Sequence, residues 1–383
     1  MINVLAFLIN FTTGMLIISY PLVAIERFGV SALTLGALGT TSAGVYALAC
    51  LVSGTLVDRI GFKKMVMAAC ALLALVYPSI LLIDGIGQLF LMAVFGSIGL
   101  SLFWPAVMRW IGEEEHGDLL RKQLGSFSIA LIAGIMVGNF VAGKLFELSP
   151  AAPYLLSALT ALAVLLLVLF TEEKNTPGGG ADQPAPRVQE RPRPGFLLIG
   201  WIANFAVFFA VGVGESLFPK LALKLGISVP LLASLVAMIP LGQIFLFVLL
   251  RRTHRWHFKY PPLLLLQLLG LMGLLLLTST SRSWIFGLAF LFLGACAGMT
   301  YFSSIFYSVY RQEGKGRKSG FHEAFLGGGV AVGPICGGLI ARSFDLRAPY
   351  WLCIVLMGIS LVVQIGILKS NQSKKNKVGL EDK

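Results

Sequence analysis

The sequence predicts an all-α membrane protein in which twelve transmembrane helices form two pseudo-symmetric six-helix bundles. Three observations predict this fold class: a very apolar composition, a regular succession of apolar runs, and a glycine pattern that occurs twice. Of the 383 residues, 57% are hydrophobic and 13% are charged, whereas about 25% of residues are charged in a typical soluble domain. This composition excludes an ordinary soluble protein.

The apolar runs are long enough to cross a bilayer, which takes roughly 20 helical residues for the ~30 Å hydrocarbon layer. Each run is expected to be a helix, because lipid offers no partners for backbone N–H and C=O groups. The twelve expected spans are residues 2–24, 31–57, 65–83, 86–111, 123–146, 151–170, 196–218, 229–250, 262–279, 284–309, 320–342 and 349–368.

Charge placement predicts the orientation of these spans. With both termini in the cytoplasm, 23 of the 30 lysine and arginine residues fall on the cytoplasmic side, as the positive-inside rule requires. We therefore expect a multi-pass protein of the cell inner membrane. The net charge of +12 then reflects orientation and anionic lipid, so nucleic acid is not an expected partner. We expect a monomer without a cofactor or metal.

The glycine pattern indicates a duplicated chain. Its two copies are 195 residues apart and have the same spacings of nine, four and five residues; they are Gly125, Gly134, Gly138 and Gly143, and Gly320, Gly329, Gly333 and Gly338. A Gly-x-Ser turn, Gly29 to Ser31, also recurs as Gly226 to Ser228. Carriers built from such repeats place their site at the midplane, between the halves.

The duplication predicts the domain organisation. We expect six-helix bundles at residues 1–170 and 196–368, followed by a cytoplasmic tail at 369–383. The segment 171–195 between the bundles is rich in proline and glycine and has no aromatic residue. That composition is typical of a flexible linker.

Helix geometry gives the glycines a packing role. Gly134 and Gly138 are four residues apart, as are Gly329, Gly333 and Gly337, so each set lies on one stripe of its helix. Small residues on a stripe let helices pack closely in lipid. Chemistry is better sought where the two copies differ, above all at Asn139 against Pro334 and at Ser128 against Glu323.

The loop between spans two and three reads Gly-Thr-Leu-Val-Asp-Arg-Ile-Gly-Phe-Lys-Lys from position 54. It resembles the G-x-L-x-D-R-x-G-R-K-x signature of the major facilitator superfamily. The matching positions are Gly54, Leu56, Asp58, Arg59, Gly61 and Lys64, with Lys63 in place of the arginine. The resemblance implies alternating access between two halves.

The same resemblance implies a conformational latch. Asp58 would hold the start of span eleven at Ser319 and Gly320, because an acid is stabilised at a positive helix N-terminus. Arg59, Lys63 and Lys64 would be local ion-pair partners and topology anchors; the alternative is that these basic residues only enforce orientation.

The glycine pattern is itself similar to the G-x8-G-x3-G-P-x-x-G-G signature of the superfamily's antiporters. The second copy keeps Gly333-Pro334, whereas the first has Asn139 at the proline position. An arginine that the family places in span four and links to proton coupling is absent, and Phe95 stands at its place. The similarity implies efflux by antiport.

Acids inside a membrane span are candidate functional groups, and two are present, Glu215 and Glu323. Glu215 carries a proton or pairs with nearby Lys220. Glu323, beside His322, carries a proton, or is a first-turn helix acid, or pairs with loop lysine and arginine residues. Further cavity candidates are Asn10, Asn204, Trp104, Tyr301 and Gln243.

These observations predict a secondary active transporter that moves a small organic solute by alternating access, with proton-linked efflux preferred. Two alternatives remain: an uncoupled facilitator or importer of a metabolite, and a non-transporting sensor or assembly factor with the same fold. An enzyme is not expected, since the sequence shows no nucleophile–base set or metal-ligand cluster.

Overall fold

A computed structural model describes residues 1–114, 117–171, 195–253, 255–309 and 315–381 of the chain. Side chains are described in these ranges except at 111–125, at 309–320 apart from Lys318, and from 372 onward. Every regular element in the described ranges is a helix. The expected linker at 171–195 lies almost entirely outside them.

Twelve spans long and apolar enough to cross a membrane are present in the described residues, and their limits agree with the predicted spans to within a few residues. Ten of them are single helices: α1 (Ile2–Phe28), α2 (Ala32–Ile60), α4 (Ile86–Glu114), α5 (Gly117–Leu148), α6 (Ala152–Leu169), α7 (Phe196–Lys224), α10 (Tyr260–Ser279), α11 (Ser283–Val309), α12 (Lys315–Ser343) and α13 (Ala348–Glu381).

The other two spans are broken near prolines. Span three consists of α3 (Phe62–Val76) and the 3₁₀ helix η1 (Tyr77–Leu82), and Pro78 lies in the first turn of η1. Span eight consists of α8 (Val229–Val236) and α9 (Met238–Arg251). Pro240 has no N–H to donate to the carbonyl four residues earlier, so the helix is interrupted just before it.

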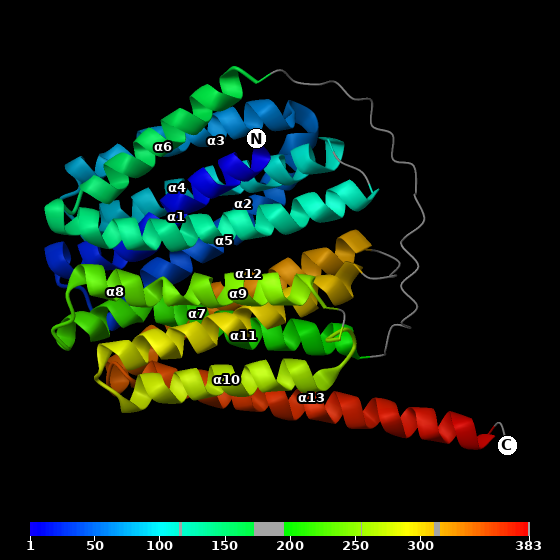
Figure 1. Ribbon diagram of the computed structural model, residues 1–383. Coiled ribbons are helices and arrows are strands. Elements are labelled where there is room, and N and C mark those ends of the chain that lie inside the picture. The colour runs from blue at the N-terminus through cyan, green and yellow to red at the C-terminus, as the bar shows by residue number, and fades with distance from the viewer. Residues whose placement is uncertain (115–116, 172–194, 254, 310–314, 382–383) are drawn as a thin grey trace.

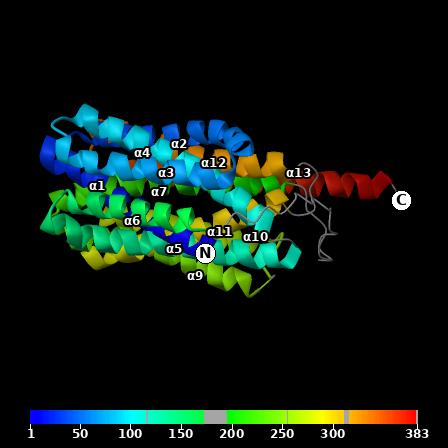
Figure 2. The ribbon, with the colours of Figure 1, turned by 90° about the horizontal axis from the view of Figure 1, so that it is seen from above.

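The same pairing pattern occurs in both halves (Figures 1 and 2). In the first, α1 packs against α5 and α6, and α4 packs against α2 and α3. In the second, α7 packs against α12 and α13, and α11 packs against α9 and α10. Each contact of the first half therefore has a counterpart six spans later, which confirms the two pseudo-symmetric bundles.

The glycine stripes make equivalent contacts in the two halves. Gly134 and Gly138 of α5 lie against backbone atoms of α1, and Gly329 and Gly333 of α12 lie against backbone atoms of α7. Gly337 continues the second stripe, against side chains of α7. A Cβ at any of the first four positions would overlap a backbone carbonyl oxygen of the facing helix, so the helices pack closely there.

The helix ends define two faces of the molecule. α1 begins and α13 ends at one face, which we call the terminal face (Figure 1). The duplicated Gly-x-Ser turns lie at the other, which we call the loop face. There Gly29 and Gly226 adopt φ of 59° and 73°, a conformation that favours glycine, and each is followed by the serine that begins the next helix.

Candidate functional site

The two halves meet near the loop face in a pair of equivalent contacts. Gly338 of α12 lies against the backbone of Ala32–Leu33 at the start of α2, and a Cβ at position 338 would be 2.7 Å from the Ala32 carbonyl oxygen. Gly143 of α5 lies in the same way against Val229–Pro230 at the start of α8, 2.9 Å from the Pro230 Cα. The last glycine of each pattern therefore joins the halves, whereas Gly134, Gly138, Gly329 and Gly333 pack within a half.

Further contacts between α2 and α12 continue toward the membrane centre and end at Thr40. Gly36 and Gly39 lie against Pro334. The Thr40 hydroxyl donates to the Ala331 carbonyl oxygen at 2.5 Å and accepts from the Ile335 amide at 3.1 Å. We call the contacts of α2 with α12 and of Gly143 with α8 the closed seam.

Beyond Thr40, toward the terminal face, the two halves separate. Gly44 and Leu51 lie on the side of α2 that faces α12 in the closed seam, yet no atom lies within 4 Å of a Cβ at 44, and Leu51 is 72% exposed. On α12, Gly327 is likewise open. The protein is thus closed at the loop face and open toward the terminal face.

Glu323 lies on the α12 stripe that faces α2, together with Gly327 and Ala331. Its side chain is 64% exposed, and its carboxylate is 3.8 Å from Nε2 of fully buried His322. Counting 1.5 Å per helical residue, Glu323 lies about 12 Å from Ala331 toward the terminal face. It points away from the glycine stripe.

His322 is held inside the second half. Its Nδ1 is 2.7 Å from the Ser304 hydroxyl of α11, and its ring packs edge-on against Tyr301, 5.1 Å between centroids. The Ser308 hydroxyl donates to the Ser304 carbonyl, and the Trp201 indole N–H of α7 donates to Ser308. Hydrogen bonds therefore connect α7, α11 and α12 next to the acid.

Two polar residues of the first half share the region of Glu323. Tyr46 of α2 is close enough to interact electrostatically with the Glu323 carboxylate and with Tyr301. Cys50 lies one turn further along α2, close enough to Tyr46 to interact electrostatically with it. The acid of the second half and the phenol of the first therefore lie on opposite sides of the open region.

The first-turn interpretation of Glu323 is wrong, because α12 begins at Lys315, earlier than expected. Glu323 is then in the third turn, beyond the reach of the helix N-terminus. Among the described residues, the basic group within 4 Å of its carboxylate is the His322 ring, at 3.8 Å, so pairing with loop lysine or arginine is not observed either.

Glu215 is half-buried in α7 and forms no ion pair with Lys220. The Lys220 ammonium donates instead to the Val30 carbonyl oxygen of the first half, which adds a polar contact at the loop-face end of the closed seam. The ion-pair interpretation of Glu215 is therefore wrong.

Asp58 of the signature loop pairs with Arg109 of α4 at 2.9 Å, and Arg109 also donates to the Val57 carbonyl. The expected partner positions, Ser319 and Gly320, are helical, but their side chains lie outside the described residues. The latch between Asp58 and span eleven thus stays a prediction.

The other signature residues have separate surroundings. Gly61 ends α2 with φ of 90°, so the tight turn there requires glycine, whereas Gly54 has no atom within 4 Å of a Cβ position. The Lys63 ammonium donates to the Thr171 carbonyl at 2.6 Å. Arg59 and Lys64 are exposed and form no ion pair with the described residues.

The remaining cavity candidates are mostly packed between helices. Asn10 is buried with its Cβ near Gly134, and Asn204 is fully buried. Gln243 lies at the contact of α9 with Gly298. Trp104 packs edge-on against Phe103 and Phe127. Of all candidates, the structure brings together Glu323, His322 and Tyr301.

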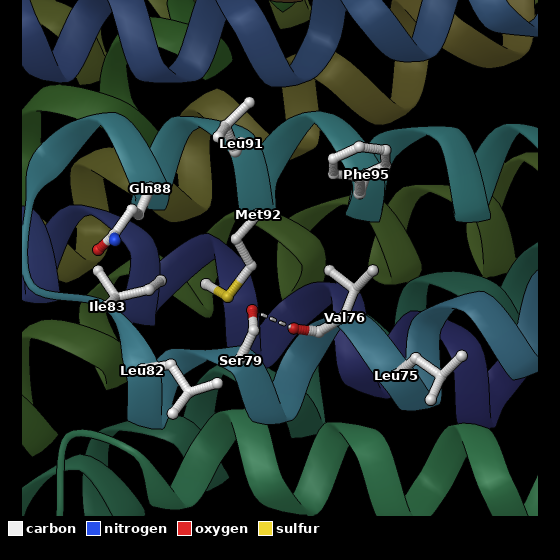
Figure 3. Close-up of a pocket in the computed structure, with 9 residues that line it drawn as sticks. All are labelled: Leu75, Val76, Ser79, Leu82, Ile83, Gln88, Leu91, Met92 and Phe95. Atoms are coloured by element: carbon white, nitrogen blue, oxygen red, sulfur yellow. Dashed lines mark hydrogen bonds between the residues drawn. The ribbon is translucent and has the colours of Figure 1, made fainter.

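Phe95, expected at the place of the coupling arginine, lines a groove between α3, η1 and α4 (Figure 3). The groove has a volume of about 350 Å³, and its other lining side chains include Leu75, Leu82 and Leu91, which are exposed. All of its lining residues come from the first half. Phe95 therefore faces this groove and not the region between the halves.

Sequence reasoning missed Thr40, Tyr46 and Arg109 as functional candidates. Arg109 was counted only as a charge on one side of the membrane, and Thr40 resembles any other span threonine. Tyr46 and Cys50 are four residues apart in a span without charges before Asp58, a spacing that places both on one side of the helix. That spacing was the available signal.

Two pseudo-symmetric bundles, joined at one face and apart at the other around an acidic side chain, define a membrane transporter of small solutes. The chain belongs to the Major Facilitator Superfamily, which it matches over residues 2–312. This family consists of transporters and not of enzymes. Its fold and membership agree with the predictions made from the signature loop.

Two relatives in Bacillus subtilis (strain 168) extend over most of the chain. The uncharacterized MFS-type transporter YfkF is 24% identical over 380 residues, 94% of this chain and 93% of the relative. Multidrug resistance protein 1 is 25% identical over 332 residues, 82% of each chain.

Solved structures share the fold at low identity. A bacterial homologue of the human lysosomal transporter Spinster, in an inward-facing and unoccupied conformation, gives a TM-score of 0.77 at 14% identity, covering 97% of this chain and 96% of its own. The nucleoside transporter NupG gives 0.71 at 11% identity, covering 96% and 97%.

Proposed function

We propose that this protein exports a small organic solute across the cell inner membrane in exchange for protons, with Glu323 as the proton-carrying acid. The terminal face is cytoplasmic in this proposal, in agreement with the distribution of lysine and arginine. The relative named multidrug resistance protein 1 supports the direction of transport.

The position of Glu323 carries the proposal. It lies on the stripe by which α12 meets α2, and in this state its side chain is 64% exposed because the halves are apart at that depth. Toward the loop face, the same two stripes are packed together at Thr40 and Gly338. Alternating access requires the exposed part of the stripe to close when the closed seam opens.

Closure around Glu323 links protonation to conformation. An ionised carboxylate that loses its water within a membrane span is unfavourable by several kcal/mol unless it is paired. No lysine or arginine of the described residues is paired with it, and its neighbours are His322 and Tyr46. The closed arrangement therefore favours the protonated acid, and opening toward the cytoplasm favours release of the proton.

The test uses reconstituted vesicles with an imposed pH gradient. The substrate is the compound that gives the largest thermal stabilisation of the purified protein in a screen of metabolites and drugs. We expect the gradient to drive uptake by the wild type, and Glu323→Gln to lose this response while substrate exchange without a gradient continues. The neutral amide keeps the size of the side chain but cannot carry a proton.

Glu215→Gln is the matched control, since Glu215 is the other acid that the sequence indicates as a candidate proton carrier. We expect it to keep the response to the gradient. Loss of the response in Glu215→Gln but not in Glu323→Gln would move the proton site to α7. A wild-type flux that ignores the gradient would show an uncoupled carrier instead.

A further inference from the structure

Thr40 makes a contact that proton coupling does not use. We propose that its hydroxyl holds the closed seam together and thereby positions the two halves. The hydroxyl then sets the ratio between two access states, one open at the terminal face and the other open at the loop face. The inference rests on the alternation of two access states in the proposed function, and not on the role of Glu323.

The backbone of α12 explains why a hydroxyl fits there. Pro334 has no N–H, and the next amide, that of Ile335, would pair with the Ala331 carbonyl in a regular helix. The Thr40 hydroxyl lies between these two groups, donating to the carbonyl at 2.5 Å and accepting from the amide at 3.1 Å. A side chain from the other half thus enters the hydrogen-bond ladder of α12.

The position of Thr40 along α2 gives the contact its effect. Gly36 and Gly39 pack against α12 on its loop-face side, while one turn away on the terminal-face side Gly44 is open. Among the described residues, Thr40 therefore makes the last hydrogen bond between α2 and α12 on the terminal-face side of the closed seam. To open the loop face, α2 must leave α12, and both hydrogen bonds must break.

The contact of Gly143 with α8 is the other part of the closed seam, and there the residue equivalent to Thr40 cannot form this bond. Gly338 contacts Ala32–Leu33, and Gly143 contacts Val229–Pro230, so these two pairs of residues are equivalent in the duplication. The same register makes Ala237 the equivalent of Thr40. Alanine has no hydroxyl. Removal of the Thr40 hydroxyl therefore leaves no hydroxyl at either of the two equivalent positions.

Thr40→Val tests the proposal, because valine keeps the shape of threonine and the two α12 groups are free to pair with each other. The reporter is a cysteine introduced by Ala233→Cys, in protein whose five native cysteines are replaced. Ala233 is fully buried against Gly143, in the part of the closed seam that Thr40 does not touch. Its exposure therefore reports movement of the halves as a whole. Its labelling by a water-soluble maleimide is timed in lipid nanodiscs without substrate at one pH.

We expect Thr40→Val to raise the labelling rate about 3- to 20-fold, the range that corresponds to interhelical hydrogen bonds in membranes. Thr40→Ser keeps the hydroxyl, and Thr41→Val removes a neighbouring hydroxyl that forms no hydrogen bond with the described residues; both are expected to stay within 2-fold of the wild type. Thermal unfolding confirms that each variant is folded, and Thr40→Ala replaces any Thr40→Val that is not.

An unchanged rate in a folded Thr40→Val, or an equal rise in Thr41→Val or Thr40→Ser, overturns the proposal. The assay involves neither substrate nor a proton gradient. Its failure therefore leaves the proton role of Glu323 standing, and failure of the Glu323 experiment leaves the role of Thr40 standing.

Discussion

Substitution of Gly138 by alanine measures how much the close packing of α5 on α1 contributes to stability. A Cβ at this position would overlap the Phe11 carbonyl oxygen and lie 3.0 Å from the Met15 amide nitrogen and 3.1 Å from the Gly14 Cα. All three are backbone atoms, which have no rotamer to change. The two helices must therefore move apart to admit one methyl group.

The magnitude follows from two opposing terms. Overpacking of a well-packed interior costs about 1–3 kcal/mol, and contact with backbone places this site at the upper end. Alanine in a helix gains about 1 kcal/mol over glycine. We therefore expect Gly138→Ala to lower the free energy of unfolding by about 2 kcal/mol.

Gly366→Ala is the matched control, because Gly366 is an exposed residue in the middle of α13 with no atom within 4 Å of a Cβ. It has the same gain in helix propensity without the overlap, so the two variants should differ by about 3 kcal/mol. For a half of this size that is roughly 6–12 °C in the thermal midpoint, measured in detergent. If Gly138→Ala were as stable as Gly366→Ala, the packing argument would be refuted.

Two further predictions concern stability. Lys63→Met removes the ammonium that donates to a carbonyl at the end of α6 and should lower the free energy of unfolding by about 0.5–1.5 kcal/mol. Lys64→Met should change it by less than about 0.5 kcal/mol. Equal effects of the two variants would contradict a stabilising role of the Lys63 hydrogen bond. Gln267 and Gln364 exchange two hydrogen bonds between α10 and α13. Either one changed to leucine removes both of these hydrogen bonds and leaves the other amide with only its contact inside its own helix. Each change should cost about 1–3 kcal/mol, and a double-mutant cycle should show that the double variant costs less than the sum.

The fold was predictable because its main determinants are local. Hydropathy alone defines twelve spans, and a glycine stripe follows from spacing. Spacing does not show which helix the stripe faces. Gly138 and Gly143 belong to one pattern, yet one packs within a half against α1 and the other joins the halves at α8.

The candidate site was predictable only where the two copies differ. Glu323 and Pro334 stand out because Ser128 and Asn139 replace them in the first copy, and both lie on the stripe of α12 that faces α2. Thr40 and Arg109 could not be identified, since each acts on a group far away in sequence. The hydrogen bond of Thr40 to Ala331 spans 291 residues, and no local pattern indicates it.

Asn139, the residue equivalent to Pro334 in the duplication, is expected to act on the same equilibrium in the other direction. Its side chain is fully buried in α5, and neither amide atom forms a hydrogen bond with the described residues. An unpaired buried amide costs about 1–3 kcal/mol, and separation of the halves at the loop face admits water to it.

We therefore expect Asn139 to disfavour the state that Thr40 favours. Asn139→Leu, of similar size and without the amide, should therefore slow labelling of the buried cysteine at position 233, opposite to the effect of Thr40→Val. A faster rate would show instead that the amide helps to close the seam.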